Sequence, residues 1–194
     1  MIDIPEGAKP GIRWKTNGLA AHELPRPKGL IECDVVLDLG CGIRPIDWYE
    51  PEQHICVDAH LPYLERIAAT GEGYRCVHGN ALDVLRGIKP GTVGAIYCLD
   101  MIEHLTRDEG AELVRLMLLA QPRQIVIFTP NGFMEQESDC WGLGGDHWQK
   151  HRSGWTVGDF PEPEWQIGSY GFGFTAMWTN ALLNDESGLA LRPN

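Results

Sequence analysis

The sequence predicts a single-domain α/β protein with a doubly wound, mostly parallel sheet. Two observations carry this prediction: short apolar runs rich in β-branched residues recur along the middle of the chain, and helical patterns separate them. The composition agrees, because 43% hydrophobic and 22% charged residues in a chain of 194 are ordinary proportions for one globular domain. Parallel strands joined in this way require right-handed crossovers.

The expected elements follow one another in a regular order. Five apolar runs are expected as buried strands, at residues 35–39, 54–57, 74–77, 93–99 and 124–129. The clearest helix covers residues 61–69, with Pro62 in its first turn and Gly71 just beyond its end. A second helix covers residues 107–120, where Thr106 and Glu109 have the spacing of a capping box.

The charge balance and the cysteines exclude several classes of function. Asp and Glu number 27 against 16 Lys and Arg, and the formal net charge of -11 disfavours nucleic acid as a partner. No stretch approaches the roughly 20 apolar residues of a membrane span, and the first residues do not resemble a signal peptide, so a cytoplasmic protein is expected. The six cysteines form no C-x-x-C pair and are expected as reduced thiols.

The first expected strand ends in a glycine-rich turn. Asp38 is the one carboxylate of this strand, and Gly40 and Gly42 follow it in a Gly-x-Gly pattern. Glycines there permit positive φ angles and let a ligand approach the backbone closely. A dinucleotide fingerprint needs a third glycine at position 45, where this chain has Pro45, and a nicotinamide cofactor is therefore disfavoured.

The segment VLDLGCG resembles the first motif of class I S-adenosylmethionine (SAM)-dependent methyltransferases, and the elements after it match that superfamily in order and spacing. The resemblance implies the fold, the cofactor SAM and the product S-adenosylhomocysteine (SAH). It also implies that the turn contacts the amino-acid part of SAM, through Asp38, Gly40, Cys41 and Gly42. A carboxylate at this place suits the ammonium group of that part.

The resemblance implies further cofactor contacts after strands two and three. Asp58 stands at the position of the family's ribose-binding acid, where a carboxylate can accept hydrogen bonds from both ribose hydroxyls. Asn80 stands where many relatives have an acid that reaches the adenine amino group, and its carbonyl can still accept from that amine. Asp83 is the alternative adenine contact, or simply a carboxylate at a helix N-terminus. The remaining expected cofactor-binding residues are Ala59, Ala81 and Leu99.

A group of acids and histidines follows the fourth strand. Asp100, Glu103 and His104 stand at i, i+3 and i+4, which in a helical turn places them on one face. They resemble the Glu-x-x-Glu-His of two metal-binding branches of the superfamily, ubiquinone-pathway O-methyltransferases and small-RNA ribose 2′-O-methyltransferases, with Asp100 for the first glutamate. His151 begins a His-x-x-x-Trp-Thr pattern that resembles a later histidine of the RNA enzymes.

Two roles are therefore expected for this group. As metal ligands, Asp100, Glu103, His104 and His151 would hold Mg²⁺ or another divalent ion. Without a metal, His104 or His151 is the expected general base for an oxygen nucleophile, because the pKa of histidine lies near neutrality, and Asp100 completes the catalytic set. A helix cap remains the structural alternative.

The expected organisation has three parts: a capping segment at 1–33, a cofactor-binding core at 34–132, and a substrate-side segment at 133–194 with candidate closing strands at 164–169 and 174–179. The leading function is methyl transfer from SAM to an oxygen, secondarily a nitrogen, of a small-molecule acceptor. The alternative is a metal-dependent RNA ribose 2′-O-methyltransferase, which is opposed by seven acids against two bases between residues 135 and 164. A catalytically silent SAM-binding module is the further alternative.

Overall fold

The computed structural model of the chain describes residues 24–183. Of the expected capping segment, residues 1–23 lie outside this range, as do residues 184–194 of the substrate-side segment. Within it, no helix is both long enough and apolar enough to cross a membrane. All six cysteines fall in the described range, and all are free thiols.

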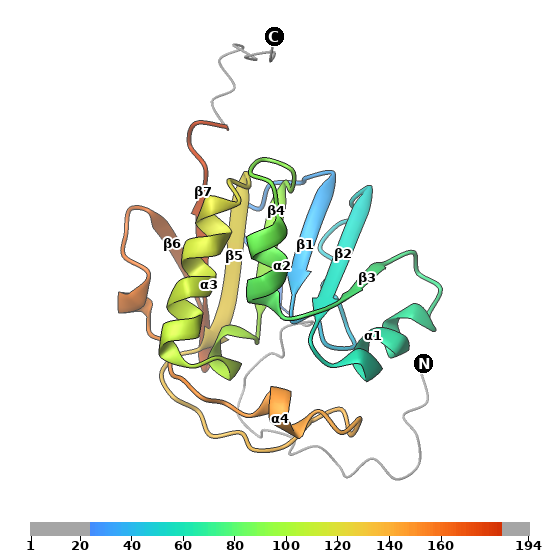
Figure 1. Cartoon of the computed structure of the whole chain (residues 1–194). Coiled ribbons are helices and arrows are strands. Elements are labelled where there is room, and N and C mark those ends of the chain that lie inside the picture. The colour runs from blue at the N-terminus through green and yellow to red at the C-terminus, as the bar shows by residue number, and fades with distance from the viewer. Residues whose placement is uncertain (1–23, 184–194) are drawn as a thin grey trace.

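One seven-stranded sheet organises the described residues, in the order β3-β2-β1-β4-β5-β7-β6 (Figure 1). Four parallel pairings join the first five strands, and β7 pairs antiparallel with both β5 and β6. The doubly wound, mostly parallel sheet predicted from the sequence is therefore confirmed, and the two closing strands complete it. The strands are β1 (Val35–Leu39), β2 (Gln53–Asp58), β3 (Arg75–His78), β4 (Ala95–Leu99), β5 (Gln124–Pro130), β6 (Trp165–Tyr170) and β7 (Gly173–Thr179).

The helices follow the predicted pattern, with additions. Helix α1 (Leu61–Ala68) and helix α3 (Arg107–Leu119) were both predicted, and Thr106 and Glu109 form the expected capping box of α3. For α2 (Ala81–Gly87) the sequence indicated only a possible helix start at Asp83 and no bounds, because seven residues are too few for a clear period. Three shorter helical pieces also went unpredicted: η2 (Ile102–His104), α4 (Asp146–Gln149) and η3 (Val157–Asp159).

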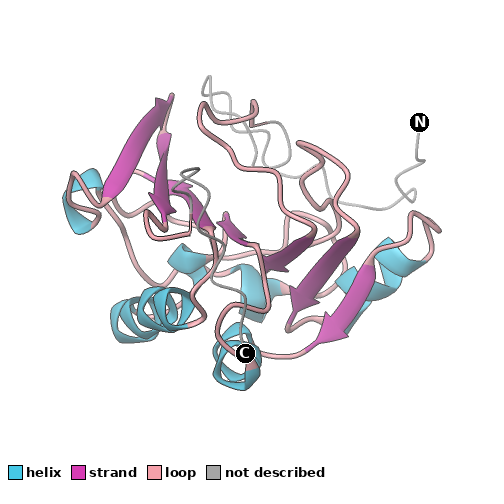
Figure 2. Ribbon diagram, turned by 90° about the horizontal axis from the view of Figure 1, so that it is seen from above, coloured by secondary structure: helices cyan, strands magenta, loops and turns pink. Residues whose placement is uncertain are grey.

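The two faces of the sheet are covered differently (Figure 2). Helices α2 and α3 pack on one face, where Leu113 and Met117 of α3 are completely buried together with Ile96 of β4. Helix α1 packs on the other face through Leu64 and Ile67. The rest of that face is covered by irregular chain from residues 24–33 and 40–52, because no helix forms in the connection between β1 and β2. Each of these large buried side chains contributes about 1.5–3 kcal/mol of hydrophobic stabilisation.

The carboxyl ends of the parallel strands meet at one edge of the sheet, and chain from beyond β5 crosses this edge with α4 on it (Figure 1). In open α/β sheets this edge is where ligands bind. The residues that follow β1, β2, β3 and β4 are therefore brought together beneath that crossing segment.

Candidate functional site

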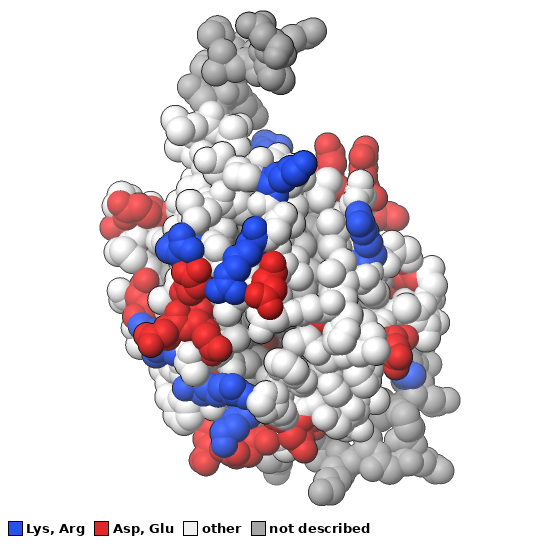
Figure 3. All heavy atoms as spheres, in the orientation of Figure 1, with Lys and Arg blue, Asp and Glu red and all other residues white. Residues whose placement is uncertain are grey.

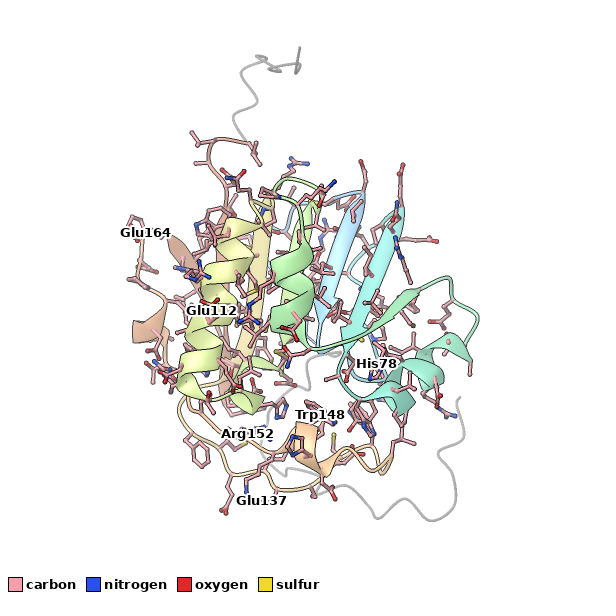
Figure 4. The ribbon with its side chains drawn as sticks, viewed as in Figure 1. His78, Glu112, Glu137, Trp148, Arg152 and Glu164 are labelled. Atoms are coloured by element: carbon pink, nitrogen blue, oxygen red, sulfur yellow. The ribbon has the colours of Figure 1, made fainter. Side chains whose placement is uncertain are left out.

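A pocket opens at the carboxyl edge of the sheet. One wall consists of residues that end or follow the first four strands, and the opposite wall comes from residues 147–152 (Figure 4). Five of the expected cofactor-binding residues line it: Gly40, Asp58, Ala59, Asn80 and Ala81. Asp100 and His104 line the same pocket, so the acid-and-histidine group lies next to the expected cofactor contacts.

The glycine turn has the geometry that its sequence predicts. Gly40 and Gly42 have φ angles of 67° and 59°, in the left-handed region that L side chains rarely adopt. The Gly40 N–H donates to the Val57 carbonyl at 2.8 Å, which holds the turn against β2. A Cβ on Gly40 would collide with the Met101 side chain, so the close packing of this turn against Met101 requires glycine at position 40.

Asp58 is buried at the end of β2 and holds two loops in place. Its Oδ2 accepts from the Gly42 N–H at 3.1 Å, and its Oδ1 accepts from the His60 N–H at 2.8 Å. Burial raises the pKa of Asp58, although the two backbone hydrogen bonds act in the opposite direction. Each carboxylate oxygen retains a second acceptor site for a ligand hydroxyl.

Asn80 caps α2, which changes the expectation for it. Its side-chain carbonyl accepts from the Leu82 N–H at 2.9 Å, so one of the two lone pairs of the oxygen expected to meet an adenine amine is engaged. The side-chain NH₂ remains as a second polar group of a residue that lines the pocket. Asp83 is exposed and pairs with Arg86 at 2.8 Å, consistent with its role as a carboxylate at a helix N-terminus.

Four other expected cofactor residues are not among those that line this pocket: Asp38, Cys41, Gly42 and Leu99. Asp38 is buried and lies 3.2 Å from Nε2 of His54. Its carboxylate therefore joins β1 to β2, where the sequence led us to expect a contact with an ammonium group. Cys41 is buried, and Leu99 packs in the sheet core. The strand pattern alone does not reveal to which face these side chains turn.

Glu103, His104 and His151 come together as the Glu-His-His cluster. One potential ligand atom from each residue lies within 4.8 Å of the others. Glu103 is buried, and its Oε2 accepts from the Thr129 hydroxyl at 3.0 Å. The rings of His104 and His151 meet edge to face, with centroids 4.9 Å apart. Segments that are distant in sequence thus converge beyond the ends of β4 and β5.

Asp100 does not belong to this cluster. The sequence led us to expect it as the fourth metal ligand, and that expectation is wrong. Its backbone has a φ of 50°, so it precedes η2 in a left-handed conformation and does not form a helical turn with Glu103 and His104. The i, i+3, i+4 argument fails here because only Ile102–His104 is helical. Asp100 still lines the pocket.

The electrostatics of the cluster favour neutral groups. Burial, together with the charge of Asp100, raises the pKa of Glu103 well above its usual range. Burial, and secondarily the neighbouring His151, lowers the pKa of His104 to about 4. Burial also lowers the pKa of His151. At pH 7 both imidazoles are therefore neutral and able to accept a proton or coordinate a metal.

Hydrogen bonds assign a tautomer to each histidine of the cluster. Nδ1 of His151 lies 2.6 Å from the Met134 carbonyl, so Nδ1 carries the proton and Nε2 carries the lone pair. His104 lies between two carbonyls, 3.1 Å from Asp100 through Nε2 and 3.4 Å from Lys150 through Nδ1. The shorter contact assigns its N–H to Nε2. Such carbonyl-bound N–H groups orient metal-ligating and catalytic histidines in general.

Sequence reasoning missed the second wall of the pocket. Residues 139–152 form it, and we call this segment the roof. It contributes the pocket residues His147, Trp148, Gln149 and Arg152. Tyr63 of α1 also lines the pocket and was not predicted. The only signal for these residues was the tryptophan-rich and glycine-rich texture after residue 132, which does not distinguish a ligand wall from ordinary irregular chain.

The chain resembles known proteins in structure, but its sequence matches none of the families or curated proteins with which it was compared. No protein-family model and no curated protein matches the chain. A SAM-dependent methyltransferase from Archaeoglobus fulgidus superposes with a TM-score of 0.54 at 16% identity, over 76% of this chain and 86% of that one. PigF with SAH gives 0.56 at 13% identity, over 76% and 50%, so this chain spans half of PigF.

A third structure combines the fold with two ligands. It is the 1,6-didemethyltoxoflavin-N1-methyltransferase from Burkholderia thailandensis with bound 1,6-didemethyltoxoflavin and SAH. It superposes with a TM-score of 0.50 at 14% identity, over 77% of this chain and 72% of that one. At such identities the likeness establishes the fold, and what the site does must be argued from its own residues.

Proposed function

We propose that the chain transfers a methyl group from SAM to an oxygen of a small-molecule acceptor. The premise is its Rossmann-like fold, which is that of class I SAM-dependent methyltransferases. One observation carries the proposal: Gly40, Asp58 and Asn80 follow three different strands and line a single pocket. These are the positions at which the sequence predicts contacts to the amino-acid, ribose and adenine parts of SAM.

The residues present fit this cofactor. Glycine at position 40 gives the turn its positive φ angle and its close packing against Met101, and this turn lines the pocket. Asp58 is already oriented by two backbone N–H groups and keeps acceptor sites for ribose hydroxyls. When bound, SAM supplies a methyl group that is activated by a sulfonium. The chain's main task is then alignment, which can contribute about 7–11 kcal/mol to lowering a barrier.

The Glu-His-His cluster supplies the proton acceptor that an oxygen nucleophile requires. His151 has its lone pair on Nε2, and because its pKa is lowered this nitrogen is unprotonated at pH 7 and can accept a proton. His104 offers a second neutral imidazole and lines the pocket itself. A general base contributes about 10²–10⁴ in rate, less than the alignment of the reactants. Loss of the base is therefore expected to be less damaging than loss of the cofactor site.

A divalent metal is the second role that the cluster supports. Glu103 Oε, His104 Nδ1 and His151 Nε2 would hold it, because each histidine keeps its other nitrogen on a backbone carbonyl. Two imidazoles and one carboxylate suit ions that accept nitrogen ligands, such as zinc or iron, better than Mg²⁺, which prefers oxygen. A bound metal would supply a Lewis acid beside the acceptor oxygen.

Charge favours a small acceptor over RNA. Acidic and basic side chains alternate on the face shown in Figure 3, with no continuous basic groove among its described residues. The pocket itself carries Asp58, Asp100 and Glu109 against Arg152. A phosphate backbone is attracted by excess positive charge, which the described part of this face lacks.

Release of SAH from SAM, measured by mass spectrometry with hydroxyl-bearing small molecules and with a short RNA, tests the proposal. We expect turnover with a member of the small-molecule panel. Turnover with the RNA alone would support the ribose methyltransferase. SAM binding without turnover on either class would support the silent module.

A chelator separates the two roles of the cluster. If a metal is required, EDTA is expected to abolish turnover and a divalent ion to restore it, while SAH affinity measured by calorimetry stays unchanged. If the histidines act only as bases, activity in EDTA is expected to remain full, and that result would remove the metal.

A further inference from the structure

The roof crosses the carboxyl edge of the sheet from α1 to η2. At one end Nε2 of His60 lies 2.9 Å from the Leu143 carbonyl. At the other end the Arg152 N–H donates to the Glu103 carbonyl of η2 at 2.8 Å. Gly145 packs so closely on α1 that a Cβ there would overlap the Tyr63 hydroxyl. The roof is therefore fixed to both sides of the pocket that it covers.

A half-buried carboxylate gives the roof a defined shape. Asp139 accepts from the N–H groups of Trp141 at 2.8 Å, Leu143 at 2.7 Å and Gly145 at 3.0 Å. The Asp139 N–H in turn donates to Asp146 at 2.6 Å, at the start of α4. Charge-assisted hydrogen bonds of this kind are the stronger class. The position of α4 over the pocket is thus built into the local structure.

Trp148 brings a large apolar surface to this pocket. It lies on α4, is 40% exposed, and shares the pocket with Ala59, Asn80 and Ala81. In Figure 4 it lies between α4 and the ends of β1 and β2, whereas Arg152 lies toward the start of α3. An indole that faces apolar and amide groups across a pocket offers a stacking surface for a flat ring.

A second observation points to a ligand in the same place. Tyr63 is buried and lines the pocket, and its hydroxyl has no hydrogen-bond partner among the described residues. Buried hydroxyls are normally satisfied, so an orphan hydroxyl in a pocket wall indicates a partner that binds there. Burial, together with the nearby Asp139 carboxylate, raises the pKa of Tyr63, but the geometry between the two side chains does not make a hydrogen bond, and Asp139 accepts from three backbone N–H groups instead.

We propose that Trp148 of the roof covers the nucleoside base of the cofactor and that the Tyr63 hydroxyl hydrogen-bonds to the same nucleoside. The inference rests on the proposed function, because it takes SAM as the ligand of this pocket. The base is assigned to Trp148 because Ala59, Asn80 and Ala81 follow β2 and β3, away from the Glu-His-His cluster beyond β4 and β5. Stacking requires only a flat ring and is tolerant of its substituents.

Calorimetry with two ligands tests the inference. SAH and 5′-methylthioadenosine share the nucleoside and differ in the amino-acid part. We expect Trp148→Ala to weaken both by the same factor, about tenfold, as stacking energies of this kind imply. Trp148→Phe keeps a ring and is expected to stay within about threefold of the wild type. Tyr63→Phe is expected to weaken both ligands by about threefold.

Phe133→Ala is the control, because Phe133 is an exposed aromatic residue beyond β5 that does not line the pocket. It is expected to leave both affinities unchanged. Tryptophan fluorescence gives an independent measurement: SAH is expected to change the emission of the wild type, and most of that change is expected to be lost in Trp148→Phe. This second readout does not depend on Trp148→Ala remaining folded.

The outcomes separate the inference from the proposed function. A wild-type protein that binds neither ligand would overturn the proposed function. A wild type that binds both ligands, with Trp148→Ala binding them equally well, would overturn the inference alone. A loss confined to SAH would place Trp148 on the amino-acid part and would also contradict the inference.

Discussion

The two halves of the candidate site are built in different ways. On the proposed cofactor side, Gly40, Asp58 and Asn80 each lie within two residues of a strand end. On the proposed acceptor side, Glu103 and His151 of the Glu-His-His cluster come from segments 48 residues apart, and their contact depends on how the chain beyond β5 folds back. A parallel sheet positions the first half almost automatically, whereas the second half requires long-range packing.

Specific contacts hold the acceptor side together. The Glu103 carbonyl accepts from the N–H groups of Arg152 at 2.8 Å and Ser153 at 3.1 Å. Trp155 packs so closely on Gly110 of α3 that a Cβ there would collide with its ring. The Arg107 guanidinium lies 3.8 Å from the centre of that ring. These contacts involve η2, α3 and the chain beyond β5, and none of them involves Gly40, Asp58 or Asn80.

The largest effect is expected at the glycine turn. Gly40→Ala forces a side chain into the left-handed region and displaces Met101, which itself lines the pocket. We expect SAH affinity measured by calorimetry to fall about 100-fold, because strain and lost space act together. Gly71→Ala is the matched control, since Gly71 has a φ of 73° and open space around it. Equal losses of affinity in the two variants would contradict the pocket assignment.

A smaller effect is expected at the end of β2. Asp58→Ala removes the acceptor for the Gly42 and His60 N–H groups together with the expected ribose contact. Hydrogen bonds to a charged group contribute about 1.5–3 kcal/mol, which corresponds to a loss of about 30-fold in SAH affinity. Asp83→Ala, at an exposed carboxylate outside the pocket, serves as the control. Unchanged affinity in Asp58→Ala would refute the ribose assignment.

The smallest effect is expected on the acceptor side. The hydrogen bond from the Arg107 guanidinium is the main cause that lowers the pKa of Asp159. The ion pair therefore stabilises the fold fully above pH ~4, where an unfolded aspartate is ionised. This contribution is lost as the pH falls through the lowered pKa of the folded state. Asp159→Asn is expected to lower the free energy of unfolding by about 1 kcal/mol at pH 7, and by less at pH 3, in urea titrations.

If the two halves are independent, Asp159→Asn should change stability without changing cofactor affinity. SAH affinity is expected to stay at the wild-type value, because Asp159 does not line the pocket. Glu164→Gln, at an exposed acid outside the ion pairs of the described residues, is the control for stability. A marked drop in SAH affinity on Asp159→Asn would show that the two halves are coupled.

The same contrast explains what the sequence could predict. The strands were found because buried parallel strands are nearly continuous apolar runs. Strand β4 begins at Ala95, two residues later than predicted, although Gly94 already hydrogen-bonds to Val35 of β1. The position of β7 between β5 and β6 depends on pairing that no local pattern encodes. The turn glycines and Asp58 were identified in the same local way.

The acceptor side was predictable only in part. Glu103, His104 and His151 were named through a resemblance, but the exclusion of Asp100 from their cluster follows from a single left-handed backbone conformation. Trp148 and Tyr63 became visible only when the roof was seen to cross the sheet edge. Long-range packing of irregular chain, rather than periodicity, decides these contacts.

A calorimetric titration of the wild-type chain with SAH tests the central claim most directly. We expect saturable binding of one SAH per chain, in the pocket between Gly40 and the roof. Absence of any binding heat at millimolar SAH, confirmed at a second temperature, would contradict it.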